Sequence, residues 1–350
     1  MLNKKTIITL TILLIFPLIL TACSNDTVEV KTAEDNAFLM DTLVQMKAHG
    51  ENADAAVEES MKRIEEIENL MSKTIETSDI YQLNNNPNQK IEVSKQSLEV
   101  LKKAKNYAEM TEGDFDPTIG ALVELWGIGT ENASVPPENK IKAALANTGY
   151  QYLNLNDNSA KITKAGVKLD LGGIAKGYAA EEVKKIVEKN GVEHAFVNLG
   201  GNVLVIGDKV DGSPWKIGIQ DPRAGRGDVM AIIDAVDLTI VTSGNYERYF
   251  EENGKLYHHI IDPKTGYPAE NNLLSVSIIS HNSFDADALS TAVYVMGLEK
   301  GMEFIENIDD VGVMFITKKL DVYLSSGLEE IVNINDPDFN LIEGEYSVVN

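Results

Sequence analysis

The chain has 350 residues, which is enough for one large domain or two of ordinary size. It carries 54 acidic and 31 basic residues, so its formal net charge is −23. Such an acidic chain is a poor candidate for binding nucleic acid or a broad anionic lipid surface, because both partners require a basic footprint.

The first segment has the composition of a bacterial export signal. Lys4 and Lys5 precede an apolar run over residues 6–20, which is too short for a comfortable membrane span. The run ends in Leu20-Thr21-Ala22-Cys23, which resembles a lipobox and implies cleavage before Cys23 and lipidation of that cysteine. Two acyl chains would give stable attachment to the extracytoplasmic face of the cell membrane. The alternative is an ordinary secretory signal with an incidental cysteine.

The chain divides into four expected segments. Residues 1–22 form the signal peptide, and the polar, acidic residues 23–36 form a flexible linker after the lipidated cysteine. Residues 37–335 form the folded domain, and residues 336–350 form a C-terminal tail. Cys23 is the only cysteine, so an intramolecular disulfide is impossible.

Helices dominate the first part of the folded domain. Partial apolar alternation predicts one strand over residues 38–46, and three-four apolar spacing predicts a helix over residues 52–71. A second helix is expected between Ser94 and Gly113, and a short helix over residues 140–148.

Strands dominate after residue 190. A helical turn is expected within residues 242–250, a helix over 284–296 and another near 300–308. Short apolar runs predict strands at 194–199, 203–206, 215–220, 229–236, 238–241, 256–261, 274–280, 311–317 and 321–324. Helices early and antiparallel strands late favour an α+β fold over a doubly wound parallel sheet.

The stretch 167–179 reads as a buried strand, a glycine turn and the start of a helix over residues 174–189. Asp170 ends the apolar run, and Gly172 and Gly173 allow a sharp turn. Backbone amides at a helix start favour anions, and Lys176 adds a positive charge. The local chemistry suggests a phosphate site beside a carboxylate; the alternative is a tight turn that packs a helix on a sheet.

Asp287 and Thr291 are four residues apart on a predicted helix and therefore face the same way. A carboxylate and a hydroxyl are hard oxygen ligands of the kind that Mg²⁺ prefers. The alternatives are an acid that interacts with the helix dipole and a buried threonine that bonds back to its own helix.

His259 lies in a predicted strand beside the turn at residues 262–268 and could act as a general acid, a general base or a phosphate contact. Its alternative is a structural histidine, and His258 should face the opposite side. Two acids flank Phe115, and the neighbouring glycines leave room for a flat ligand; the alternative is a capped helix start, with Asp116 at the N-cap and Pro117 at N1.

Six motifs in one order resemble the ApbE family, the FAD:protein FMN transferases, over roughly residues 38–325. The motifs span residues 113–118, 170–178, 198–202, 242–246, 259–268 and 286–292. The resemblance implies that residues 37–335 form an ApbE-like flavin transferase domain with a T-fold-like α+β core of antiparallel sheets and packed helices. It also implies Mg²⁺-dependent transfer of FMN from FAD to a Thr or Ser hydroxyl of an exported acceptor protein, through a phosphoester bond, with release of AMP.

The resemblance also implies residue roles. Mg²⁺ would be held by Asp287, Thr291 and the backbone carbonyl region of Gly173. FAD would lie near Met40, Asp114, Phe115, Asp116, Asp170, Lys176 and His259. His259 is the first candidate for the general base and Asp170 the second.

Two other functions stay open at this point. An FAD pyrophosphatase would use the same site with water as the nucleophile, and a flavin-binding lipoprotein would carry the cofactor without chemistry. Asn245 stands where members of the family often carry Asp. The acceptor protein and the oligomeric state are not specified by any motif.

Overall fold

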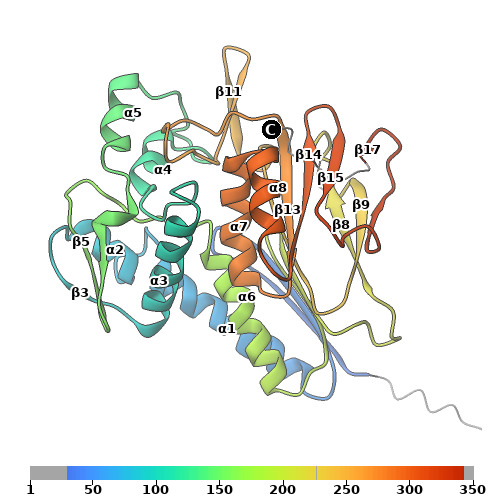
Figure 1. The fold of residues 1–350 in the computed structure, drawn as a ribbon. Helices are drawn as coiled ribbons and strands as arrows, with labels where there is room; N and C mark the ends of the chain where they lie inside the picture. The colour runs from blue at the N-terminus through green and yellow to red at the C-terminus, as the bar shows by residue number, and fades with distance from the viewer. Residues whose placement is uncertain (1–29, 226, 343–350) are drawn as a thin grey trace, which may run out of the picture.

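A nine-stranded sheet forms the centre of the computed structural model, which describes residues 30–225 and 227–342 (Figure 1). All neighbouring pairs are antiparallel except the last one. From edge to edge the strands are β1 (Thr32–Leu39), β2 (Thr42–His49), β6 (His194–Leu199), β7 (Asn202–Ile206), β10 (Thr239–Gly244), β13 (Leu273–Ser280), β14 (Val311–Thr317), β15 (Asp321–Leu324) and β17 (Asn340–Leu341). The signal peptide and Cys23 lie outside the described residues.

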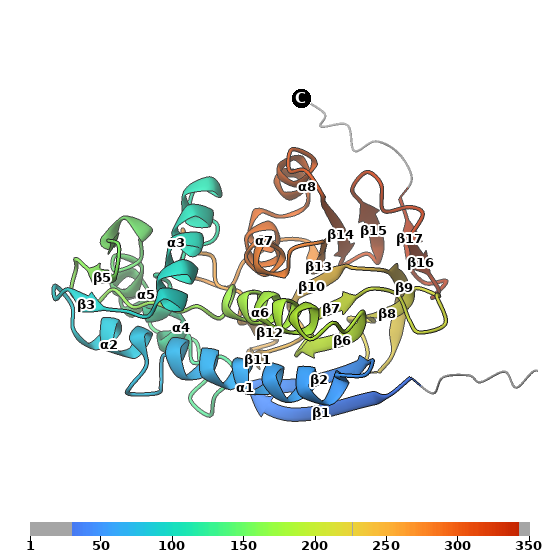
Figure 2. The same cartoon turned by 90° about the horizontal axis from the view of Figure 1, so that it is seen from below.

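Three long helices cover one face of this sheet (Figure 2). They are α1 (Ala53–Met71), α6 (Ala175–Lys189) and α7 (Ser283–Met296), and α8 (Leu298–Glu306) packs on α7 and β14. Strand residues alternate between the two faces. Val313 and Phe315 join the core beneath the helices, whereas Met314 and Ile316 join a second core on the other face.

A small sheet closes the second core. It consists of β16 (Val332–Ile334), β9 (Val229–Ala235) and β8 (Trp215–Gln220). Antiparallel sheets with helices packed on one face confirm the α+β class.

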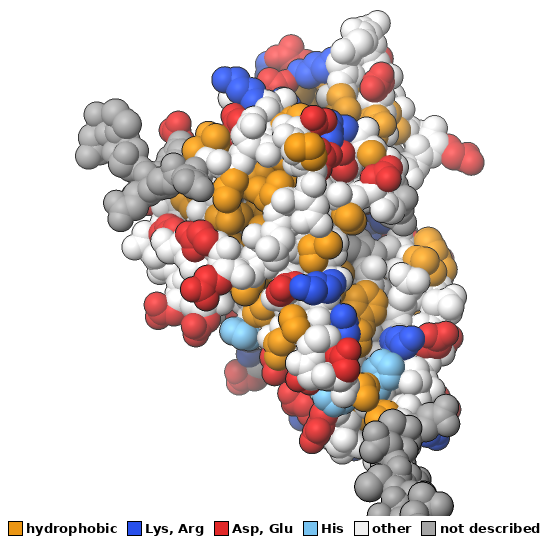
Figure 3. All heavy atoms as spheres, turned by 90° about the vertical axis from the view of Figure 1, so that its right-hand side faces the viewer, with side chains coloured by type: hydrophobic (Ala, Val, Ile, Leu, Met, Phe, Trp, Pro, Cys, Tyr) orange, Lys and Arg blue, Asp and Glu red, His pale blue; other side chains and the backbone are white. Residues whose placement is uncertain are grey.

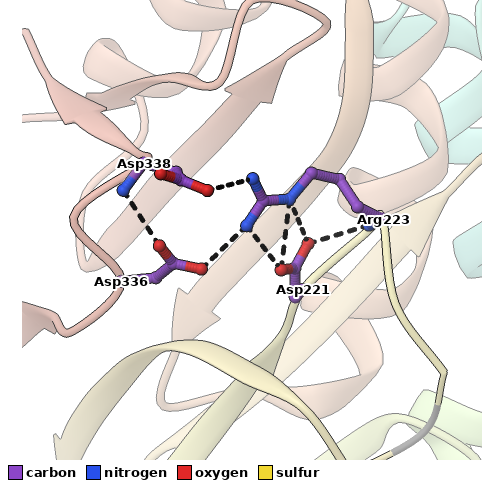
Figure 4. A network of polar contacts seen from close by, with 4 residues as sticks. All are labelled: Asp221, Arg223, Asp336 and Asp338. Atoms are coloured by element: carbon purple, nitrogen blue, oxygen red, sulfur yellow. Dashed lines mark hydrogen bonds and ion pairs between the residues drawn. The ribbon is translucent and has the colours of Figure 1, made fainter.

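Arg223, in the turn between β8 and β9, holds the C-terminal segment (Figure 4). Its guanidinium bonds to Asp221, Asp336 and Asp338, at 2.8 Å in each ion pair, and lies over the ring of Phe339. These three acids, the ring of Phe339 and the pairing of β17 with β15 belong to the folded body. Residues 336–342, expected as the start of a tail, are therefore part of the fold, because Phe339 and β17 complete the second core and the edge of the sheet.

A helical lobe lies beside the sheet. It contains α2 (Asp79–Asn85), α3 (Lys95–Met110), the 3₁₀ turn η1 (Tyr150–Tyr152), and a small sheet of β3 (Ile91–Glu92), β5 (Ser159–Ile162) and β4 (Leu153–Leu155). Further on, α4 (Gly120–Trp126) and α5 (Glu138–Leu145) pack near the hairpin of β11 (Tyr249–Glu252) and β12 (Lys255–His258). Trp126 is fully buried there and donates to the carbonyl oxygen of Gly266 at 2.9 Å, so it is a core residue.

Three local predictions are wrong. The strand expected over residues 38–46 is a hairpin, because Met40 and Asp41 adopt positive φ values of 53° and 59° and form a two-residue turn. The linker ends earlier than residue 36, since β1 begins at Thr32. The helical turn expected within residues 242–250 is instead the end of β10 and the start of β11, because pairing with β13 extends β10 to Gly244.

Among the described residues, no helix has both the length and the apolar character needed to span a membrane. Figure 3 shows the face that carries the small sheet, where Asp and Glu side chains are spread out and Lys and Arg side chains stand among them. This face shows no single basic patch, in keeping with the acidic composition.

Candidate active site

The glycine turn before α6 is held by Asp170. Its Oδ1 accepts a hydrogen bond of 2.8 Å from the backbone N–H of Gly172, and its Oδ2 accepts one of 2.6 Å from Lys73 Nζ. The side chain of Asn84 bonds to both the N–H and the C=O of Leu169. Asp170 therefore shapes the turn and has a lysine partner that no sequence motif singled out.

Asp287 joins α7 to the start of α6. Asp287 is 3% exposed, and its Oδ2 accepts a hydrogen bond of 2.9 Å from the N–H of Gly177. Gly177 lies in the first turn of α6, where backbone amides have no partner within their own helix. Lys176 Nζ lies 3.7 Å from Asp287 Oδ1 and donates to the carbonyl oxygen of Gly172 at 2.9 Å. A carboxylate, an ammonium and the backbone of the glycine turn thus converge.

Thr291 and Phe115 border the same turn. A Cβ placed on Gly173 would lie 3.1 Å from Thr291 Oγ1 and 3.3 Å from the ring of Phe115. The structure therefore brings together Gly173, Thr291 and Asp287, the three residues expected to hold a metal. Their donors are a carboxylate, a hydroxyl and backbone carbonyls, a set of hard oxygens that fits Mg²⁺. The described residues contain no cluster of three or more His, Cys, Asp and Glu side chains with metal-binding geometry.

His259 approaches from the segment after β12. Its backbone N–H and its ring Nδ1 both lie near the carbonyl oxygen of Arg248, at 3.0 and 3.3 Å. Burial, and then the charge of Arg248, lower the pKa of His259 to about 4. The ring is therefore neutral near pH 7. Since a carbonyl can only accept, Nδ1 carries the ring hydrogen and Nε2 is left as a proton acceptor.

His258 has separate contacts. It is 6% exposed, its Nε2 lies 3.0 Å from the carbonyl oxygen of Ala269, and its ring meets Tyr294 edge-on. Burial lowers its pKa to about 4. His258 is thus a structural histidine, as its place beside His259 in a strand led us to expect.

The turn between β1 and β2 reaches the same region. Met40 donates its N–H to Glu68 Oε1 at 2.9 Å, and Arg248 Nη2 donates to the carbonyl oxygen of Asp41 at 3.0 Å. Arg248 therefore joins this turn to His259. Neither Glu68 nor Arg248 was singled out individually, because each acts through a contact with a residue far away in the sequence.

The two acids beside Phe115 are occupied by protein groups. Asp114 accepts from Lys264 Nζ and Lys300 Nζ, each at 2.7 Å. Asp116 accepts from the N–H and hydroxyl of Thr118 and from the N–H of Tyr150, while burial raises its pKa.

The position of Asp116 decides one alternative. Helix α4 begins at Gly120, so Asp116 is not its N-cap, and the capped helix start is wrong. The acid instead bonds within its own turn and to the 3₁₀ segment at Tyr150. Both acids hold the loop that presents Phe115, and flavin contact by them stays a prediction.

Asn245 is buried next to the site's supporting strands. Its Nδ2 donates to the carbonyl oxygen of Leu273 at 3.2 Å. An ionised Asp at this position could not donate that bond, so the amide suits the local backbone.

Two surface hollows of the helical face lie elsewhere. One of about 410 Å³ is bordered by Lys103, Tyr178 and Phe284, and one of about 370 Å³ by Arg63 and Glu182. Neither includes a residue expected to bind metal or flavin.

Comparison with known proteins gives a consistent result. The sequence profile of the ApbE family matches residues 40–315. The FAD:protein FMN transferase of Treponema pallidum is 36% identical over 304 residues, covering 82% of this chain and 84% of that protein. The enzyme of the same name from Klebsiella pneumoniae is 36% identical over 290 residues, covering 81% and 88%.

Solved structures agree. The crystal structure of the ApbE protein from Thermotoga maritima superposes with a TM-score of 0.80 at 36% identity, covering 86% of this chain and 99% of that one. The flavin transferase ApbE from Vibrio cholerae gives 0.78 at 30% identity, with coverage of 86% and 99%.

Proposed function

The chain belongs to the ApbE family, and from that membership we propose that it is an FAD:protein FMN transferase. FMN passes from FAD to a Thr or Ser hydroxyl of an exported acceptor protein, and AMP leaves. The acceptor oxygen forms a bond to the flavin-side phosphorus while the bond from that phosphorus to the bridging pyrophosphate oxygen breaks. The family resemblance of the sequence is confirmed, whereas the metal, the leaving group and the acceptor are part of this proposal.

The observation that carries the proposal is the convergence of Asp287, Thr291 and Lys176 on the glycine turn at the start of α6. Displacement at phosphorus depends mainly on positioning and on neutralising phosphate charge. Asp287, Thr291 and the Gly173 backbone would hold Mg²⁺, which when bound would offset pyrophosphate charge. Lys176 adds a second positive charge, and the positive end of the α6 dipole favours the same anion.

His259 is the better of the two candidate bases. Its ring is neutral near pH 7 and Nε2 is free to accept the proton of the acceptor hydroxyl. Both oxygens of Asp170 are engaged by Lys73 and Gly172, so Asp170 supports the turn. Phe115, held by its flanking acids, offers an apolar ring beside Gly173 for the flavin nucleotide.

We further propose that the protein works at the extracytoplasmic face of the cell membrane. The support is the lipobox-like stretch that ends at Cys23. A diacylated cysteine would tether the enzyme without a membrane-spanning helix. Globomycin treatment, followed by mass spectrometry of the cellular protein, tests the lipidation.

The test of the reaction is an incubation with FAD, Mg²⁺ and a peptide that contains Asp-Gly-Ala-Ser-Gly-Ala-Thr, a sequence patterned on the acceptors implied by the resemblance. We expect a peptide heavier by one FMN moiety together with free AMP. Free FMN and AMP beside an unmodified peptide would instead favour the pyrophosphatase, and unchanged FAD would favour a flavin-binding lipoprotein. An Asp287→Asn enzyme is the matched control, because the substitution removes charge with little change in shape.

A further inference from the structure

Strand β1 is an open edge of the nine-stranded sheet. Among residues 30–225 and 227–342, only β2 pairs with it. Its register with β2 is continuous from Thr32 to Leu39, without a bulge, and it contains neither Pro nor Lys. Figure 2 shows β1 at the outside of the sheet, with α1 on one side of it. Bulges, prolines and lysines are the usual devices that close an edge to further pairing, and β1 lacks all three.

The outward groups of β1 follow from its turn. A two-residue hairpin pairs Leu39 with Thr42, so both bonding groups of Leu39 and of every second residue before it point to β2. The N–H and C=O of Glu34, Asn36 and Phe38 therefore point outward. One contact agrees with this assignment: the N–H of Asn36 donates to the side chain of Asp35 at 2.7 Å and not to a strand.

The open edge leads directly to the candidate active site. After Leu39 the chain enters the turn at Met40 and Asp41, which Glu68 and Arg248 hold beside His259. A strand added to β1 would therefore bring one of its ends to this turn.

An exposed apolar pair marks the end of the edge nearest the site. Phe38 is 74% exposed and Leu43, its partner across the hairpin, is 44% exposed. Both lie on the face of the hairpin that α1 does not cover, because the alternate residues Ala37 and Val44 pack on the core beneath the helices. Isolated exposed apolar residues are common, but here the pair borders a free strand edge that ends at the site.

The charge of β1 favours an extended segment of another protein over β1 of a second copy as the strand that pairs with this edge. Glu34 and Asp35 are exposed acids in the middle of β1. Glu34 also lies 3.5 Å from Lys47 Nζ of β2. Pairing β1 with β1 of a second copy would place four such acids on two adjoining strands, which is unfavourable wherever they come opposite one another. An extended segment without acids opposite them meets no such repulsion.

We propose that the acceptor protein binds by adding an extended segment, without acids opposite Glu34 and Asp35, to the outer edge of β1, with an apolar side chain against Phe38 and Leu43. The inference rests on the proposed transferase function and names how that site receives its acceptor. Main-chain hydrogen bonds supply affinity in this mode and alternate side chains supply selectivity.

The test uses the full chain in detergent with the acceptor peptide described above, extended on both sides by alanine and valine. Single N-methyl groups are placed on successive peptide bonds. In a strand paired with β1, only every second peptide N–H faces β1. An N-methyl group at one of these positions should lower kcat/KM for transfer by about tenfold, the upper value for one net hydrogen bond, whereas an N-methyl group at the positions in between should have little effect. An equal effect at every position, or no effect at any, would overturn the proposal.

Two variants test the protein side. Phe38→Ser should lower kcat/KM for the peptide. Leu341→Ser, which also replaces an exposed apolar side chain but at the opposite edge of the sheet, should not. Asn36→Pro removes an outward N–H that the β1–β2 ladder does not use, so it should block docking and spare the fold. Quenching of flavin fluorescence should show unchanged FAD binding in all three.

Peptide binding in the absence of FAD, followed by fluorescence anisotropy, separates docking from chemistry. Alternating N-methyl effects on binding without any transfer would retain the docking site and reject the transferase function. A concentration-dependent dimer that Asn36→Pro abolishes, with peptide binding unaffected, would assign the edge to a second copy and overturn the proposal.

Discussion

The carboxylate of Asp287 accepts a hydrogen bond of 2.9 Å from the backbone N–H of Gly177, where α7 crosses the first turn of α6. The crossing is so close that a Cβ on Gly177 would lie 2.3 Å from the carbonyl oxygen of Ser283 and 2.7 Å from Asp287 Cβ. The orientation of Asp287, an expected metal ligand, therefore depends on the close packing of α6 and α7 at Gly177.

Gly177→Ala should destabilise the protein by about 1–3 kcal/mol, because the added methyl group must push the two helices apart. Urea unfolding measures the change. Gly225→Ala is the matched control, since a Cβ there meets no atom within 4 Å, and its effect should stay within about 0.5 kcal/mol. Equal shifts for the two variants would show that the crossing is not tightly packed.

Asp287→Asn should raise the Mg²⁺ concentration for half-maximal transfer by about tenfold or more, because it removes the only carboxylate of the expected donor set. The amide oxygen can still accept from Gly177, so the melting temperature should change little. Asp285→Asn on the same helix is the control, as Asp285 is held by Lys103 and Tyr107. An unaltered Mg²⁺ titration for Asp287→Asn would reject Asp287 as a ligand.

Lys73→Met should raise the KM for FAD by about tenfold, because Asp170 loses a charged hydrogen bond that helps to hold the glycine turn. Steady-state kinetics with varied FAD gives the value. Lys168→Met is the control. Lys168 lies two residues before Asp170 in the sequence and also pairs with a carboxylate, that of Glu124. The same rise in KM for both variants would mean that only the general loss of positive charge matters.

The acid limb of the pH profile of kcat/KM should fall near pH 4 if His259 is the general base. Burial and Arg248 lower the pKa of His259 from 6.5 to about 4, so the ring keeps its free Nε2 well below pH 6.5. Transfer rates between pH 4 and 8, in buffers of constant ionic strength, test this. Arg248→Met should move the limb toward higher pH, and a limb at pH 6.5 in the unaltered enzyme would contradict the assignment.

Stability should also fall as the pH decreases from 6.5 to about 4, in part because of His258. Its folded pKa is lowered to about 4 by burial, so within this window the unfolded chain binds more protons than the folded one. The free energy of unfolding therefore rises with pH, by up to about 1.4 kcal/mol per pH unit from this group. Urea unfolding at several pH values should show that the free energy of unfolding depends less steeply on pH in His258→Gln. An unchanged pH dependence would contradict this role of His258.

Some residues of the candidate active site could be predicted from the sequence, and others could not. Asp287 and Thr291 were found together because helical spacing places residues four apart on one face, and Asp170, Gly173 and Lys176 because they lie in one short motif. Lys73 was not found, since it bonds to Asp170 across 97 positions of the chain and stands in no motif of its own. Glu68 and Arg248 were missed for the same reason.

The sequence by itself determined the acidic character of the chain, the α+β class, most helices and strands, and the membership of the ApbE family, because these depend on composition, local periodicity and ordered motifs. Only the tertiary structure decided that residues 38–46 form a hairpin whose turn meets Arg248, that Asp114 and Asp116 are occupied by protein groups, and that Phe339 completes a core. Within the described part of the chain, it also left β1 at the edge of the sheet. These features arise from contacts between segments that are distant in the sequence. The stability of such contacts depends on tertiary packing, which a local sequence pattern does not predict.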